Sequence, residues 1–488
     1  MMRYASFGLC VLLALCVGCS DEITPSGPNS LGPIDPSVYV AIGNSVTAGY
    51  QNGALYEGAQ LYSYPKLIAD RLGVSFVQPL ISEPGTGERI TLVSLNPIQL
   101  VTSEKSLLPV KSPYDTLSRP YDNLGIPGAV SLDATDETDF RQKSTSRGNP
   151  FFTLILRDQK YGKSVVKQAL ARQPTLVTFW LGNNDVLGFA TSGGTSPSAP
   201  VPSNAFDISI TSALTALRQG APQAFILVGN IPDINAIPFF TTVGPIISAA
   251  LSSLAGAPPG SVKLYYQLHG MTTGTDTTNF MRLKNVLIPL TGMTYVPSIG
   301  LPTGKWYRDL AEKLKEPLVN VIPSRIDTTK PFGLDPRNPW PDALVLDIQE
   351  LTSVSSAIQA YNASIEGAIN RLNNKPGQPN IALVNIRRLF NEAADRGITI
   401  AGETFTTQFI SGGLFSFDGI HPSSKGQAII ANEFIRTMNE TYGANIAQVD
   451  VSKIPGLPVP LAKNARRKLA FWTAASGVFD SIVRLMQP

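Results

Sequence analysis

Histidine and cysteine are scarce in this chain of 488 residues, which limits the chemistry it can carry out. The histidines are His269 and His421, and the cysteines are Cys10, Cys16 and Cys19. Because every cysteine lies near the N-terminus, the rest of the chain cannot form a disulfide. So few nitrogen and sulfur ligands argue against a zinc site. We therefore expect no metal and no cofactor.

Charge is also sparse. Charged residues make up 15% of the chain, against about 25% in an average soluble protein. Lys and Arg total 39 and Asp and Glu total 36, giving a net charge of +3 without a long basic run. The sequence therefore lacks the clustered positive charge that is typical of nucleic-acid-binding proteins. The hydrophobic share of 43% is instead sufficient for a large buried core.

The N-terminus carries a targeting signal. Arg3 precedes an apolar run, 7–17, that is too short to span a bilayer comfortably. Residues 15–19, "LCVGC", resemble the lipobox of bacterial lipoproteins, in which cleavage before Cys19 leaves an acylated N-terminus, although Cys16 stands where leucine is usual. The alternative is an ordinary signal peptide with incidental cysteines.

The lipobox interpretation predicts a location. Residues 1–18 would be a lipoprotein signal peptide, and the Pro/Gly/Ser-rich stretch 19–36 would be a flexible tether. The mature protein would be lipid-anchored in a bacterial cell envelope, held to the membrane by Cys19. Ser20 after the cysteine is compatible with the outer membrane, by resemblance to enterobacterial lipoproteins.

Strand-like and helical patterns alternate between residues 37 and 448. Helical spacing of apolar residues is clear at 63–73 and 351–372, and a late helix is expected at 425–438. Such alternation is typical of an α/β fold: a three-layer sandwich with a central parallel sheet covered by helices. Ligands of these sheets bind at the carboxyl ends of the strands. The short apolar runs expected to form strands are 38–43, 74–77, 175–182, 224–230 and 381–386.

Polar motifs follow several of these runs. Ser45 lies in "GNSVTAG" after the first run, and Asn184 lies in "GNND" after the third. Gly128 falls in the turn "NLGIPGA", and Asp418 and His421 lie in "DGIHP" before the late helix. A serine needs an adjacent base to act as a nucleophile, and a carboxylate can hold the imidazole in the required tautomer. An amide and backbone N–H groups can stabilise the resulting oxyanion.

The four motifs, in this order, resemble those of the SGNH (GDSL-type) hydrolase family. The resemblance implies a flavodoxin-like sandwich and a serine esterase, lipase or carbohydrate esterase without a cofactor. It implies Ser45 as nucleophile, His421 as base, Asp418 as its orienting acid, and an oxyanion hole formed by Ser45, Gly128 and Asn184. The family commonly has Asp where this chain has Asn44. That change removes a charge beside the nucleophile.

Alternatives remain at each motif. Ser45 or Thr47 could simply cap a helix after the first strand, and "DGIHP" could be a surface turn. A lipid-anchored binding protein on the same scaffold, without turnover, is the second class of function. A Gly-x-Ser-x-Gly elbow of α/β-hydrolases is absent. The substrate would be a small-molecule, lipid or glycan ester, with neither its acyl group nor its alcohol readable from the sequence.

Long intervening segments enlarge the hydrolase domain, 37–448. Residues 241–345 are expected to form a cap-like insertion over the site. The stretch 239–260, at its start, would either line an acyl pocket or form a buried helix within its own domain. The C-terminal tail, 449–488, contains an amphipathic pattern that would lie on a membrane surface or pack back onto the domain.

Overall fold

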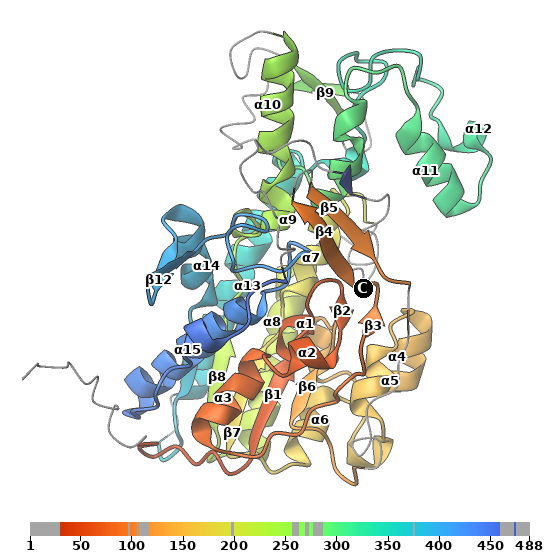
Figure 1. The fold of residues 1–488 in the computed structure, drawn as a ribbon. Helices are drawn as coiled ribbons and strands as arrows, with labels where there is room; N and C mark the ends of the chain where they lie inside the picture. Colours follow the sequence, from red (N-terminus) through yellow and green to blue (C-terminus); the bar gives the residue numbers. More distant parts are fainter. Residues whose placement is uncertain are drawn as a thin grey trace, which may run out of the picture.

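A five-stranded parallel sheet forms the centre of the computed structural model (Figure 1). The structure describes residues 30–95, 98–104, 106, 117–196, 200–255, 263–268, 273–276, 286–373, 376–458 and 473–474. The strands, in their order across the sheet, are β11 (Ile381–Val384), β8 (Phe225–Gly229), β7 (Leu176–Trp180), β1 (Tyr39–Gly43) and β6 (Asn123–Gly125).

Helices flank this sheet and make it the middle layer of an α/β sandwich, as expected. Helix α3 (Tyr64–Leu72) packs on α15 (Ser424–Tyr442), and the rings of Tyr64 and Phe434 stack with centroids 4.8 Å apart. A second pair, α8 (Ser203–Gly220) and α13 (Ile348–Asn373), packs through the stacked rings of Phe206 and Tyr361. Strands covered on both sides can be apolar throughout, which explains their continuous hydrophobic runs.

The expected strand at 74–77 is wrong, and β6 takes the edge position beside β1. Val77 exchanges hydrogen bonds with Asp122 alone, through its backbone N–H and C=O. Phe76 stacks on Tyr39, with ring centroids 5.1 Å apart. The apolar character of this segment therefore serves packing against β1, without the repeated pairing that a strand requires.

Residues of the expected insertion lie beyond the edge of the sheet at which the strands end (Figure 1). That this segment acts as a cap over the site stays a prediction. Its elements are α10 (Val243–Ala255), β9 (Leu264–Gln267), β10 (Thr273–Asp276), the 3-10 helices η6 (Leu290–Ser298) and η7 (Asp342–Leu344), α11 (Lys305–Leu314) and α12 (Leu318–Val321).

Short elements complete the domain. Besides the central sheet, the described residues form small sheets that pair β2 with β3, β9 with β10, β12 with β13, and β5 with both β4 and β14. The strands are β2 (Ala54–Leu55), β3 (Thr86–Gly87), β4 (Ile90–Leu95), β5 (Ile98–Thr102), β12 (Ile398–Ile400), β13 (Glu403–Phe405) and β14 (Thr473–Ala474). The helices are α2 (Glu57–Gln60), α4 (Phe140–Ser146), α5 (Phe151–Leu156), α6 (Val165–Leu170), α9 (Pro238–Thr241) and α14 (Ile386–Asp395).

Several expectations fall outside the described residues. These are the signal peptide 1–18 with Cys10 and Cys16, most of the tether including Cys19, and His269. The tail expected to carry an amphipathic helix is also outside, except for residues up to 458 and the two residues of β14, which are extended and pair with β5. Within the described ranges, no helix combines the length and apolar character needed to cross a bilayer.

Candidate active site

Ser45 is the first residue of helix α1 (Ser45–Ala48), which begins immediately after β1. Asn44 caps this helix, since its Oδ1 accepts the backbone N–H of Val46 at 3.1 Å. A Cβ on Gly43 would lie 1.9 Å from Oγ1 of Thr47, so only glycine lets the helix fold so closely over the strand end. The expectation that Ser45 or Thr47 would be the cap is therefore wrong, and the Ser45 hydroxyl is left for another partner.

That partner is His421. Its Nε2 lies 2.8 Å from Oγ of Ser45, and its Nδ1 lies 3.0 Å from Oδ2 of Asp418. All three side chains are buried. The loop that carries Asp418 and His421 is closed by a hydrogen bond from the Ser416 N–H to the His421 carbonyl, at 2.8 Å. With Asp418 ionised, Nδ1 holds the ring proton and Nε2 is free to accept the proton of Ser45.

Asp418 is held as a carboxylate by the groups around it. Its Oδ1 accepts the backbone N–H groups of Ile420 at 3.0 Å and His421 at 2.8 Å. Burial alone would raise the pKa of this carboxyl, but the charge and hydrogen bonds of His421, together with the Ile420 N–H, lower the pKa below its usual value. The surface-turn interpretation of this loop is therefore wrong, because Asp418 and His421 face inward with no exposed area.

A loop that the sequence analysis did not single out braces Asp418. The N–H of Gly53 donates to Oδ2 of Asp418 at 2.9 Å. Asn52 accepts the N–H of Phe417 on its Oδ1 at 2.9 Å and donates its own N–H to Oγ of Ser416 at 3.0 Å. The Asn-Gly pair that follows the serine motif is a turn signal. The partners of that turn lie more than 360 residues away, beyond what local patterns reveal.

Asn184 connects helix α7 to the turn that carries Gly128. It is the first residue of α7 (Asn184–Thr191), and its Nδ2 donates to the carbonyl of Ala129 at 2.8 Å. Gly128 adopts φ +80°, a conformation that favours glycine. The Asn184 side chain also lines the pocket beside Ser45, whereas Gly128 is not among the lining residues.

Asp185 fixes the position of α7 through hydrogen bonds with Ser131. Its carboxyl oxygens accept the hydroxyl of Ser131 at 2.6 Å and the Ser131 N–H at 2.8 Å. Burial raises the pKa of Asp185 to about 7, although the hydrogen bonds from Ser131 oppose this shift. The contact joins the start of α7 to the segment that follows Gly128. It therefore links the two motifs that carry Asn184 and Gly128.

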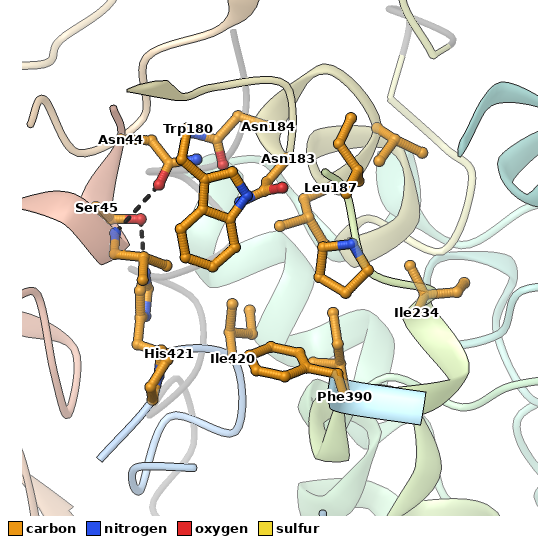
Figure 2. Close-up of a pocket in the computed structure, with 16 residues that line it drawn as sticks. Asn44, Ser45, Trp180, Asn183, Asn184, Leu187, Ile234, Phe390, Ile420 and His421 are labelled. Atoms are coloured by element: carbon orange, nitrogen blue, oxygen red, sulfur yellow. Dashed lines mark hydrogen bonds between the residues drawn. The ribbon is translucent and has the colours of Figure 1, made fainter. Parts of the chain in front are cut away.

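A pocket opens directly beside Ser45 and His421 (Figure 2). Its space, including the part open to solvent, is about 510 Å³. Most of its wall is apolar, and its side chains include Trp180, Leu187, Ile234, Phe390 and Ile420. The pocket contains no described residue of 239–260, so the acyl-pocket alternative for that segment is wrong for its described part. Residues 231–237 provide that wall instead.

Within the described part of the chain, no cluster of three or more His, Cys, Asp or Glu side chains has a geometry that could hold a metal ion. The groups near Ser45 are already engaged with one another, since His421 contacts both Ser45 and Asp418. The arrangement is therefore suited to proton transfer between a hydroxyl and an imidazole.

A buried serine–imidazole–carboxylate chain at the strand ends of a parallel α/β sheet defines the class of serine hydrolases. Comparison with protein families agrees, because the model of the GDSL-like Lipase/Acylhydrolase family matches residues 39–273 and 303–434. This chain belongs to that family, also called SGNH hydrolases, and is a hydrolase. No curated protein and no solved structure matches it.

Proposed function

We propose that this protein hydrolyses carboxylic esters through an acyl-enzyme on Ser45. The observation that carries this proposal is the continuous hydrogen-bonded chain from Ser45 through His421 to Asp418, buried at one end of an apolar pocket. His421 takes the hydroxyl proton while Oγ bonds to the ester carbonyl carbon. It then donates that proton to the alcohol oxygen as the carbon–oxygen bond breaks. Water repeats the sequence to release the acid.

The oxyanion of each tetrahedral intermediate needs fixed donors. We assign this role to the N–H groups of Ser45 and Gly128 and to Nδ2 of Asn184. Nδ2 has two hydrogens, and the carbonyl of Ala129 accepts one of them, which leaves the second for the oxyanion. Since Ala129 directly follows Gly128, this bond supports a shared location for the two donors. Removing one such donor typically costs about 10²–10³ in rate.

Asn44 changes the electrostatics of the nucleophile but keeps its geometry. Its side chain caps α1 through a single acceptor oxygen, a contact that an aspartate could also make. A carboxylate at this position would place a negative charge next to Ser45 and disfavour the developing oxyanion. The amide supplies the cap without that charge.

A fluorophosphonate probe tests the proposal most directly, because it reacts with an activated serine. The wild-type protein should be labelled and should hydrolyse an activated acetyl ester. Ser45→Ala should lose the label and at least about 10³-fold in kcat, with the fold intact. If Ser45→Ala equals wild type, the assignment is wrong. A protein that is neither labelled nor active would instead be a binding protein on a hydrolase scaffold.

We also propose that the protein is a lipoprotein of a bacterial cell envelope, anchored in the outer membrane through Cys19. The support is the apolar run followed by "LCVGC" and the Pro/Gly-rich stretch before the domain. Metabolic labelling with a fatty acid should mark the wild-type protein. Cys19→Ala should abolish the label. An unlabelled mature protein that begins at another residue would refute this anchor.

A further inference from the structure

Asn183 presents an unsatisfied amide in the apolar pocket. It directly precedes Asn184 and lines the same wall, where Figure 2 shows it between Asn184 and Leu187. The residue is 6% exposed, and its Oδ1 is buried without a hydrogen-bond partner among the described residues. A buried polar group left unpaired is unfavourable, so a ligand group that pairs with it gains affinity. The mechanism proposed above makes no use of it.

The chemistry of the acyl-enzyme indicates which part of a substrate meets Asn183. After the alcohol leaves, the acyl carbon stays bonded to Ser45 and its oxygen faces Asn184. The acyl chain must then continue into the pocket, which extends from Ser45 past Leu187 toward Ile234 (Figure 2). Asn183 is adjacent to Asn184 along this path. It therefore faces the carbons close to the carbonyl group.

We propose that the substrate is an ester of a hydroxylated aliphatic acid, and that Asn183 recognises the acyl hydroxyl. This inference rests on the proposed esterase function. The apolar wall of Leu187, Ile234 and Phe390 accommodates the hydrocarbon, and Asn183 pairs with a hydroxyl near the ester. A hydroxyl both donates and accepts, so it satisfies the amide whichever way the amide is turned. A plain chain has no hydrogen-bonding group at this position and would leave Asn183 unpaired.

The test compares activated p-nitrophenyl esters that share one leaving group. Butanoate is compared with each enantiomer of 2-hydroxybutanoate and 3-hydroxybutanoate, after correction for their rates of alkaline hydrolysis. In the wild type, at least one hydroxy ester should show a kcat/KM about tenfold above that of butanoate, since the hydrogen bond pairs a buried amide. Asn183→Leu, which is similar in size, should remove that preference.

Leu187→Ala provides the matched control. Leu187 lies one helical turn after Asn183 on α7 and lines the same pocket. Its truncation should lower kcat/KM for all the esters by a similar factor, about three- to tenfold, and leave the hydroxyl preference unchanged. The contrast separates loss of apolar contact from loss of the amide.

Three outcomes overturn the inference. The first is that no hydroxy ester is preferred, and the second is that the preference survives in Asn183→Leu. The third is that the wild type prefers glycol monobutanoate to propyl butanoate, in kcat/KM, and that Asn183→Leu removes this preference. That result would mean that the pocket holds the alcohol part of the ester. Fluorophosphonate labelling of Ser45 distinguishes these results from failure of the esterase proposal. A labelled, active enzyme without the hydroxyl preference contradicts only the inference.

Discussion

Gly53 and Asp418 are joined by a hydrogen bond of 2.9 Å from a backbone N–H to the Oδ2 atom that also faces Nδ1 of His421. Oδ2 therefore has two partners and Oδ1 has two backbone donors, Ile420 and His421. The carboxylate is fully engaged, and its orientation is set jointly by its own loop and by Gly53 of a distant turn. This arrangement determines what an amide in its place would do.

Asp418→Asn should lower kcat by about 10²–10⁴. Two backbone donors face Oδ1, so the oxygen of the new amide should take that position and its NH₂ should take the position of Oδ2. The NH₂ would then donate to Nδ1 of His421 and leave the ring proton on Nε2, the wrong tautomer for accepting the proton of Ser45. Steady-state kinetics on an acetyl ester measure the loss. Activity within twofold of wild type would show that Asp418 does not set the tautomer.

The two histidines should differ sharply in their effect. His421→Ala removes the group 2.8 Å from Oγ of Ser45 and should reduce kcat at least about 10³-fold. The kcat of His269→Ala should remain within about threefold of wild type, because His421 already serves as the base for Ser45. Both variants are compared by kcat on the same ester and by the rate of fluorophosphonate labelling. The proposed triad is refuted if His269→Ala is the more damaging change.

Asn184→Ala should lower kcat by about 10²–10³ with little change in KM, because the donor acts on charge that develops in the transition state. The change also leaves the carbonyl of Ala129 without its donor, at a stability cost of about 1 kcal/mol. Kinetics should therefore be measured well below the unfolding temperature. A change confined to KM would instead place Asn184 in ground-state substrate binding.

The contribution of Asp185 to stability should fall as pH rises from about 4 to about 7. The pKa of this group is about 7 in the folded protein and about 3.9 in an unfolded chain. Between these values the folded state binds more protons, so the free energy of unfolding decreases with rising pH. The contribution is fully present below about pH 4 and is lost through pH 7. At most it amounts to about 4 kcal/mol.

Asp185→Asn isolates that contribution. The amide imitates the protonated carboxyl and can still accept the N–H of Ser131, so the variant should fold and should lack this pH-dependent component. Urea unfolding of both proteins between pH 4 and pH 8 measures the difference. If the two free energies of unfolding keep a constant difference across this range, the pKa of Asp185 is not raised.

The sequence predicted most of the central sheet because its strands are buried on both faces. Four apolar runs became β1, β7, β8 and β11. The failure at 74–77 has a clear cause, since an apolar segment can pack on a sheet without pairing with it. Strand β6 was missed because it has only three residues, Asn123–Gly125, and begins with a polar side chain that turns back to Thr47 and Gln78.

The site was predictable where short motifs carry its chemistry and unpredictable where it depends on distant packing. Ser45, Asp418 and His421 each lie in a recognisable motif, and the structure brings them into contact. Asn52 and Gly53 contact Asp418 and its loop from a remote turn, which periodicity cannot reveal. The unpaired amide of Asn183 is visible only once the walls of the pocket are assembled.

Ser45 and His421 are separated by 376 positions in the chain. A ribosome therefore completes the nucleophile early and the base late, after the sheet residues up to β11 have been made. Until then Ser45 lacks a proton acceptor, and Asp418 cannot meet the turn at Gly53. If Ser45 and His421 act as proposed, the nascent chain should be inactive during its synthesis, and activity should arise together with the docking of α15, which begins at Ser424.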